Sequence, residues 1–212
     1  MEDNFSPLKH MVVSMLYHVS SEIKNSANCS DDLIARAKGG DDEAFGLIFD
    51  HYYRFIYKFI YAMAGERNLA EELTQETFLR AYRSIQSLQD EAKLRTWLCG
   101  IAKNVIYKSA RSRQRRVKVS GDEIESFDVP DEKILPPDEE FLNKELKVLI
   151  HAALEKLDED KRLVFTLKEI QNLSYQEISE ITGYTISKLK TDLNRAKAEM
   201  RGRLRSLREV NE

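Results

Sequence analysis

Two clusters of basic side chains carry the binding chemistry that this sequence offers. The first lies between positions 186 and 208, which hold eight Lys or Arg and two acidic residues. With the apolar stripe of this stretch turned inward, the residues that point outward are Ser187, Lys188, Lys190, Thr191, Asn194, Arg195 and Lys197. Side chains of these types bind phosphates and base edges of nucleic acids. A solvated helix face with ordinary lysines is the alternative interpretation.

The second cluster has no acidic residue between positions 103 and 118 and consists of Lys103, Lys108, Arg111, Arg113, Arg115, Arg116 and Lys118. Arg95, Trp97, Asn104 and Tyr107 belong to the same predicted helix. Basic residues interleaved with aromatic ones favour a nucleic acid with partly unstacked bases, because every base has a face for stacking. Alternatively, Trp97 is a core residue and the basic run ends a helix at its negative pole. We expect Trp97 to be mostly buried, but the basic run is too long for dipole matching alone.

Asp192 interrupts the first basic cluster with a negative charge. It stands four residues from Lys188 and three from Arg195, a spacing that favours an ion pair within one helix. The alternative is that its carboxylate accepts a hydrogen bond from a cytosine amino group. We favour the ion pair.

No catalytic, cofactor or metal-binding motif accompanies the basic clusters. His10, His18, His51 and His151 are scattered, and the sequence lacks the glycine-rich phosphate loops and the metal-ligand spacings. We therefore predict a protein that is not an enzyme and needs no cofactor or metal. Cys29 and Cys99 fit a reducing compartment, and Cys99 is expected to be a core thiol.

The elements that position these residues are predicted to be helices. The sequence has only 8 Gly and 4 Pro, which disfavours an all-β sandwich or barrel. Apolar residues follow the helical period in one face made of Phe45, Ile48, Phe49, Tyr52, Phe55, Ile56, Phe59, Ile60 and Met63. Asp41 should cap this helix and Gly65 should end it. Asn68, with Glu71 three residues later, should cap a second helix whose buried stripe is Leu73, Phe78, Ala81, Tyr82 and Ile85. A third helix should begin near Lys93.

Residues 117–140 divide the chain into two predicted domains. The segment 121–140 has nine acidic residues, one lysine and three prolines, which predicts an extended, non-helical linker. We thus expect an N-terminal extension (1–29), a helical domain (30–116), this acidic, proline-containing linker and a second helical domain (141–212). No run of residues approaches the apolar length of a membrane span, so no membrane insertion is expected.

The second domain shows the pattern of a helix-turn-helix. Ser174 and Glu177 form a capping box on a short helix that should end at Gly183, and Thr185 should cap the next helix. The residues expected to face inward from that helix are Ile186, Leu189, Leu193, Ala196 and Met200. Helix pairs with tight turns also occur in plain bundles, so the basic face adds to the argument for DNA binding.

Two strings of the sequence resemble the extracytoplasmic-function sigma factors. Their region two is similar to NLAEELTQETFLRAYRSI (68–85), followed by LRTWLCGIAKN (94–104) and the basic run to Arg116. Their region four is similar to ALEKLDEDKRLVFTLKEIQNLSYQEISEITGYTISKLKTDLNRAKAEMRGRL (153–204). The order of the two motifs and the acidic linker between them make the resemblance specific. The chain departs from the family pattern at Tyr184–Thr185, Asp192 and Asn194. These departures affect which −35 sequence the chain would recognise, and they do not affect the role that the resemblance implies.

The resemblance implies a cytoplasmic bacterial sigma factor that binds core RNA polymerase, through the β′ clamp and the β subunit, and directs promoter recognition, melting and initiation. By this resemblance, the residues that would bind the polymerase are Glu71, Glu72, Gln75, Glu76 and Arg80. The −10 element would be read by Arg95, Trp97, Lys103, Asn104, Tyr107, Lys108 and Arg111, and the −35 element by the helix from Thr185 to Lys197. Family membership also implies an anti-sigma factor as partner. A stand-alone helix-turn-helix regulator that needs no polymerase is the alternative.

Overall fold

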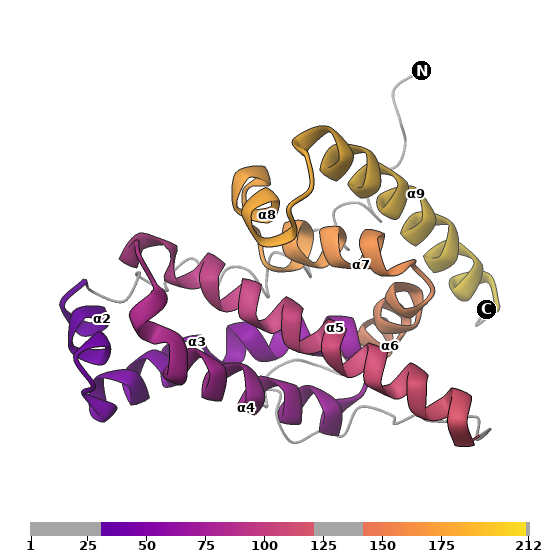
Figure 1. Ribbon diagram of the computed structural model, residues 1–212. Coiled ribbons are helices and arrows are strands. Elements are labelled where there is room, and N and C mark those ends of the chain that lie inside the picture. Colours follow the sequence, from indigo (N-terminus) through magenta and orange to yellow (C-terminus); the bar gives the residue numbers. More distant parts are fainter. Residues whose placement is uncertain (1–30, 121–141, 211–212) are drawn as a thin grey trace.

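Two helical bundles pack against each other in this computed structural model, which describes residues 31–120 and 142–210 (Figure 1). The first bundle contains α2 (Asp31–Lys38), α3 (Asp42–Ala64), α4 (Arg67–Ser84) and α5 (Leu94–Ser120). The second contains α6 (Leu142–Glu155), α7 (Glu159–Phe165), α8 (Tyr175–Thr182) and α9 (Ile186–Val210). The predicted all-α class is confirmed, since no strand occurs within these ranges. The N-terminal extension with Cys29, and the linker from residue 121 onward, lie outside the described residues.

Helix α3 packs against α2, α4 and α5 through the predicted apolar face. That face is buried along its length except at Phe49, which is half-buried with its ring 4.8 Å from Phe78. Both predicted ends are confirmed. The Asp41 carboxylate accepts a hydrogen bond from the Ala44 amide at 3.0 Å, and Gly65 ends the helix with φ of +76°. Only glycine adopts this backbone readily, and an added Cβ at Gly65 would also overlap the Glu155 carboxylate.

Helix α4 begins earlier than predicted. It starts at Arg67 with Glu66 in the cap position, so the expected cap at Asn68 is wrong. No side chain caps this end; instead Glu66 pairs with Arg113 of α5 at 2.7 Å, and Glu71 pairs with Arg67 at 3.3 Å. A contact between helices, together with the sharp turn at Gly65, therefore sets this start in place of a local capping box.

Helix α5 follows two short turns and extends further than predicted. The turns are η2 (Ile85–Ser87) and η3 (Glu91–Lys93), and the Asp90 carboxylate accepts a hydrogen bond from the Ala92 amide at 3.0 Å. Residues 117–120, assigned by the sequence to a non-helical linker, are the end of α5. Basic residues in the last turns of a helix are stabilised by its negative C-terminal pole, which favours this continuation.

The helix-turn-helix is formed as predicted. Ser174 and Glu177 make the capping box of α8, Gly183 ends that helix with φ of +75°, and the Thr185 hydroxyl accepts a hydrogen bond from the Lys188 amide at 3.3 Å. Behind it, α7 continues into a π-helical turn, η5 (Thr166–Ile170). Buried residues of α7, η5, α8 and α9 form the core, among them Leu163, Leu167, Ile178, Leu189 and Leu193.

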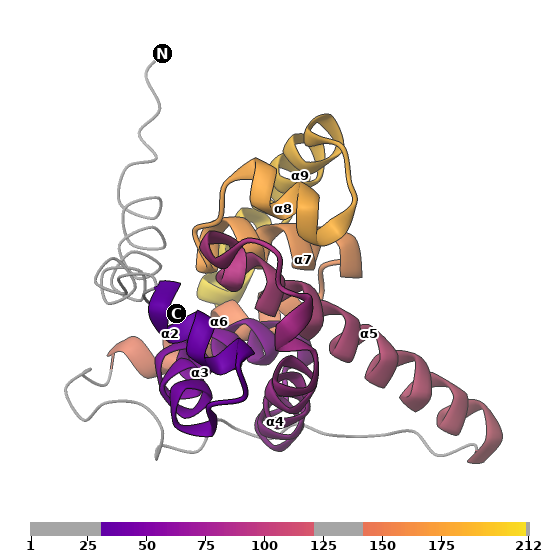
Figure 2. The same cartoon turned by 60° about the vertical axis from the view of Figure 1, so that its left-hand side comes forward.

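The two bundles share an extensive interface. The second bundle lies directly against the first (Figure 2). Helix α8 contacts α5, while η5 and α6 contact α3. The buried apolar residues of both bundles form one continuous cluster. The sequence predicted two domains on a flexible tether and gave no indication of this contact. Among the described helices, none combines the length and the apolar character that crossing a bilayer requires.

Candidate nucleic-acid interface

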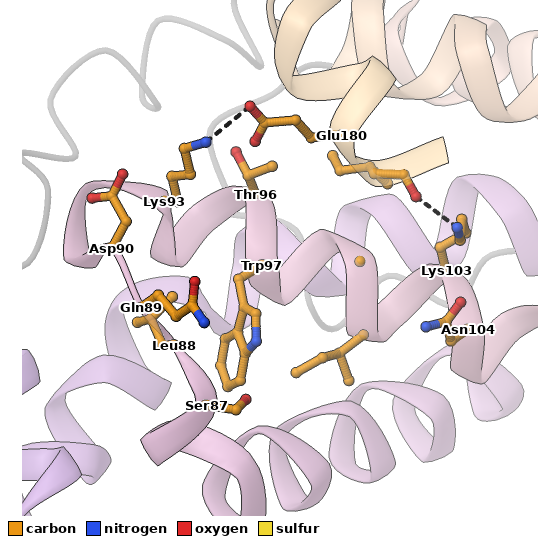
Figure 3. A pocket seen from close by; sticks show the side chains of 13 residues that line it. Ser87, Leu88, Gln89, Asp90, Lys93, Thr96, Trp97, Lys103, Asn104 and Glu180 are labelled. Atoms are coloured by element: carbon orange, nitrogen blue, oxygen red, sulfur yellow. Dashed lines mark hydrogen bonds and ion pairs between the residues drawn. The ribbon is translucent and has the colours of Figure 1, made fainter. Parts of the chain in front are cut away.

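A pocket of about 560 Å³ lies where the α4–α5 connection, the first turns of α5 and helix α8 meet (Figure 3). The α4–α5 connection contributes Ser87, Leu88, Gln89 and Asp90. Helix α5 contributes Trp97, Lys103 and Asn104, and α8 contributes Glu180 and Ile181. An indole ring, an ammonium and an amide thus line one cavity, which is a combination able to stack on a base, attract phosphate and form hydrogen bonds with a base edge.

Trp97 is both a core residue and a residue that lines the pocket, so neither of the two interpretations of the sequence excludes the other. The side chain is half-buried and packs against the core, while the indole also lines the pocket next to Ser87 (Figure 3). Part of the side chain is therefore held by the core, and part of it borders an open cavity. A ring held in this way is able to stack on a base, because an immobilised ring loses little entropy when a ligand binds.

Lys103 and Arg95 reach toward the second bundle. The Lys103 ammonium donates a hydrogen bond to the Ile181 carbonyl at 2.6 Å, and its pKa is lowered by burial. The Arg95 guanidinium donates to the Gln171 carbonyl and lies 4.5 Å from the centre of the Phe55 ring. Both cations thus have partners in a part of the chain that the sequence placed in a separate domain.

The other residues predicted for the basic surface of α5 differ in their exposure to solvent. Asn104, Lys108 and Arg111 are exposed, whereas Arg113 is held by Glu66. Tyr107 is half-buried, burial raises the pKa of its phenol, and its hydroxyl has no hydrogen-bond partner among the described residues. The exposed cations therefore continue along α5 beyond the pocket, on the part of the helix that α8 does not cover.

The outward face of α9 carries most of the residues predicted for it. Thr185, Ser187, Lys190, Thr191, Asn194 and Arg195 are exposed, and Leu189, Leu193, Ala196 and Met200 are buried. The prediction for Ile186 is wrong, because this residue was expected to face inward and its side chain is 40% exposed. As the first residue of α9 it has no preceding helical turn of α9 to cover it, so it borders the polar face and adds an apolar group there.

Lys188 and Asp192 are paired with each other, so they are not among the unpaired charged residues on the outward face of α9. Their side chains form an ion pair of 2.5 Å, and Lys188 also lies 2.9 Å from Asp160. Tyr184 donates to the same Asp160 at 2.6 Å. Burial lowers the pKa of the Lys188 ammonium, but the carboxylates of Asp192 and Asp160 outweigh burial, so the pKa is raised. The favoured ion-pair interpretation of Asp192 is confirmed, with Lys188 as the partner.

Lys197 is neutralised in a similar way. Its ammonium lies 2.9 Å from the Glu169 carboxylate of η5. The sequence counted Lys188 and Lys197 as outward-facing cations, yet each has an acidic partner in another element. Lys190 and Arg195 are the exposed cations that remain between residues 185 and 197.

The polar face predicted on α4 is present, with two apolar residues that the sequence analysis missed. Glu72 and Gln75 are exposed, while Glu76 pairs with Arg80 at 2.7 Å. Leu79 is 44% exposed, and Tyr82, which was expected in the buried stripe, is 46% exposed. The Tyr82 hydroxyl donates to Asp42 at 2.6 Å and its ring packs on Phe45, so the first turn of α3 holds it at the surface. The spacing of Gln75, Leu79 and Tyr82 could have indicated a shared face.

Cys99 is a core thiol, as expected. It is fully buried, and burial raises its pKa to about 12. A thiol in this state is a poor nucleophile, because the thiolate is the reactive form.

Comparison with known proteins gives the class of the two bundles. The sigma-70 region 2 family model matches residues 48–116, and the sigma-70 region 4 model matches residues 147–200. A solved complex of the sigma factor RpoE with the anti-sigma factor NepR from Bartonella quintana has a similar fold, with a TM-score of 0.65 and 25% identity over 76% of this chain and 96% of that one. The bundles therefore have the architecture of a sigma factor.

Sequence relatives narrow the class. The ECF sigma factor SigX of Bacillus subtilis is 32% identical over 170 residues, which cover 79% of this chain and 87% of SigX. SigW of the same organism is 34% identical over 180 residues, which cover 82% of this chain and 96% of SigW. The chain belongs to the extracytoplasmic-function (ECF) RNA polymerase sigma factors, as its motifs indicated. This result favours a sigma factor over the stand-alone regulator, and sigma factors are in general initiation factors without enzymatic activity.

Proposed function

We propose that this sigma factor brings core RNA polymerase to its promoters through three surfaces on separate helices. The observation that carries the proposal is the pocket beside Trp97, because it joins a stacking ring to Lys103 and Asn104 within a region-two fold. The reaction itself is supplied by the polymerase. This chain supplies recognition and strand separation in the cytoplasm, and no cofactor is needed.

The pocket is the proposed site for −10 bases of the non-template strand. Taking a base out of the duplex costs a few kcal/mol, and stacking on an aromatic ring returns about 1–3 kcal/mol per base. Arg95, Lys103, Lys108 and Arg111 would follow the phosphate backbone along α5, with Asn104 and Tyr107 beside them. Exposure of Lys108 and Arg111 on the same helix supports a continuous path.

Helix α9 is the proposed reader of the −35 element. Recognition helices place their N-terminal residues against base edges in the major groove. Lys190, Thr191 and Asn194 are exposed on the N-terminal half of α9 and would read bases, while Thr185, Ser187 and Arg195 would bind phosphates or base edges beside them. Lys188 and Lys197 would act through their ion pairs by fixing α9 against Asp160 and Glu169.

The outer face of α4 is the proposed contact with the β′ clamp of the polymerase, with the β subunit contacting the region-four domain. Glu71, Glu72, Gln75, Glu76 and Arg80 supply its polar rim, and Leu79 supplies an apolar centre. Interfaces of this kind combine a small desolvated centre with a polar border. An anti-sigma factor is the further proposed partner, supported by the similar sigma factor that was solved with NepR.

Run-off transcription with purified core polymerase and a promoter library tests the proposal. We expect new start sites only when this chain is present.

Trp97→Ala should remove permanganate-reactive thymines around −10, and Trp97→Phe should restore part of that signal because it keeps a stacking ring. Lys190→Ala and Arg195→Ala should weaken −35 binding. Full transcription by both of these variants would show that α9 is not the −35 reader.

A further inference from the structure

Tyr184, in the turn between α8 and α9, has a partner for each of its polar groups. Its amide donates to the Thr182 hydroxyl at 3.1 Å, and its carbonyl accepts a hydrogen bond from the Ser179 hydroxyl at 2.7 Å. Its phenol donates to the Asp160 carboxylate of α7 at 2.6 Å. The ammonium of Lys188, in the first turn of α9, lies 3.9 Å from the centre of the tyrosine ring. One residue of the turn therefore contacts α7, α8 and α9.

Asp160 divides its carboxylate between this turn and α9. Its Oδ1 accepts the hydrogen bond from Tyr184, and its Oδ2 lies 2.9 Å from the Lys188 ammonium. The Tyr184 hydroxyl, followed by Lys188, lowers the pKa of Asp160, so the carboxylate is charged at neutral pH. Hydrogen bonds with a charged partner are stronger than those between neutral groups. A single side chain thus ties the turn and the start of α9 to the same point of α7.

These directional contacts complement the apolar contacts of α9. Leu189 and Leu193 are buried on its inner side, but hydrophobic burial is non-directional and leaves small rotations of a helix possible. Lys188 pairs with Asp160 of α7 and with Asp192 one turn further along α9, so the charged contacts extend from α7 into α9. Recognition of a ligand requires that the contacting groups be held within about 0.5 Å of their productive positions.

We infer that Tyr184 and Asp160 are positioning residues for −35 recognition, which fix the orientation at which α9 enters the major groove and do not contact DNA themselves. The inference rests on the proposed function of α9. It adds two residues that lie outside the recognition helix. Without their contacts, α9 would spend part of its time in orientations that still meet phosphates but misplace Lys190, Thr191 and Asn194. The affinity for the correct sequence falls in proportion to the fraction of productively oriented helices.

A positioning role has a signature that charge and stability do not share. Removing an acidic residue from a DNA-binding domain strengthens binding to any DNA, because it reduces the repulsion of phosphates. Loss of position instead weakens only binding to the correct sequence, since phosphate contacts carry no sequence information. A merely structural role would leave the ratio of the two affinities unchanged in the folded protein.

Fluorescence anisotropy of the full chain with two duplexes tests the inference. One duplex carries the −35 element of a promoter found by run-off transcription, and in the other this element is scrambled. Tyr184→Phe keeps the ring and the charge, and should lower the affinity for the −35 duplex about three- to tenfold, the net effect of one hydrogen bond. Its affinity for the scrambled duplex should not change. Asp160→Ala should lose at least as much on the −35 duplex and lose nothing on the scrambled one.

Combining Tyr184→Phe with Asp160→Ala should lower the −35 affinity no further than Asp160→Ala alone, because both substitutions act through one carboxylate. Glu159→Ala is the matched control. It removes an exposed acidic residue from the same first turn of α7, so the loss of charge and of the interaction with the helix dipole is similar. The ratio of its two affinities should not fall.

An unchanged affinity ratio in Tyr184→Phe would overturn the inference, and so would additive losses in the double variant. This holds even if Asp160→Ala fails to fold, since Tyr184→Phe removes a single hydroxyl. If the unmodified chain, alone and with core polymerase, does not distinguish the two duplexes, then α9 is not the −35 reader and the proposed function fails together with the positioning role.

Discussion

The ammonium of Lys188 lies 2.5 Å from the carboxylate of Asp192, one turn further along α9. The pair places a buried acid in the middle of a basic helix without leaving its charge unpaired. It also means that the number of cations in the sequence of α9 exceeds the number available to DNA.

Salt dependence of −35 binding should distinguish the free cations from the paired ones. Arg195→Ala is expected to reduce the slope of log affinity against log salt by about 1, because Arg195 is an exposed cation proposed to bind phosphate and each phosphate contact releases counterions from DNA. Lys197→Ala should change the slope much less, since Lys197 is already paired with Glu169. Fluorescence anisotropy of a −35 duplex over a range of salt concentrations measures both. Equal changes in slope would contradict the distinction.

Ile186 is expected to contact a thymine methyl group at one position of the −35 element. It is an exposed apolar residue at the start of the proposed recognition helix, where base contacts are made. Replacing that thymine by deoxyuridine removes one methyl group and should lower affinity about three- to fourfold. Ile186→Ala should bind both duplexes alike. A scan in which no single thymine is sensitive in the unmodified protein would exclude this contact.

Leu79 is expected to lie at the centre of the polymerase contact. Leu79→Ala should weaken binding to core polymerase about five- to tenfold, because burying the exposed part of a leucine contributes on the order of 1 kcal/mol. Leu47→Ala is a suitable control, since Leu47 is 51% exposed on α3. Biolayer interferometry with immobilised core enzyme compares the two variants. A comparable loss of affinity in Leu47→Ala would show that α4 has no special part in docking.

His151 should make the folded chain sensitive to acid. Its ring lies at a tilt against the Tyr61 ring with the two centres 4.1 Å apart, and burial, followed by the charge of Arg162, lowers its pKa from 6.5 to about 4. The native state thus favours the neutral ring. Its stabilising effect is complete above pH 6.5 and is lost as the pH falls toward 4, by up to about 3 kcal/mol.

The His151→Phe variant isolates this effect, because phenylalanine keeps the ring contact and does not titrate. Urea unfolding followed by circular dichroism at several pH values gives the free energy of unfolding for both proteins. The loss of stability between pH 6.5 and pH 4 should be smaller in the variant. Parallel curves for the two proteins would show that His151 is not the responsible group.

The sequence by itself determined the helices, several of their ends and the family. Helix periodicity and capping depend on residues three to five positions apart, so Asp41, Gly65 and the Ser174–Glu177 box could be recognised locally. Besides the helical residues 117–120, the wrong predictions are the cap at Asn68 and the burial of Tyr82 and Ile186. These three fall where another helix, or the lack of a preceding turn, decides the outcome.

Only the tertiary structure decided which charged residues are free and which surface is covered. Lys103 meets Ile181 across 78 positions, and Lys93 meets Glu180 across 87. No local spacing rule extends over such separations, and an acidic linker suggested two bodies held apart. The interface between them depends on the shapes of two completed bundles, which no segment of the sequence carries alone.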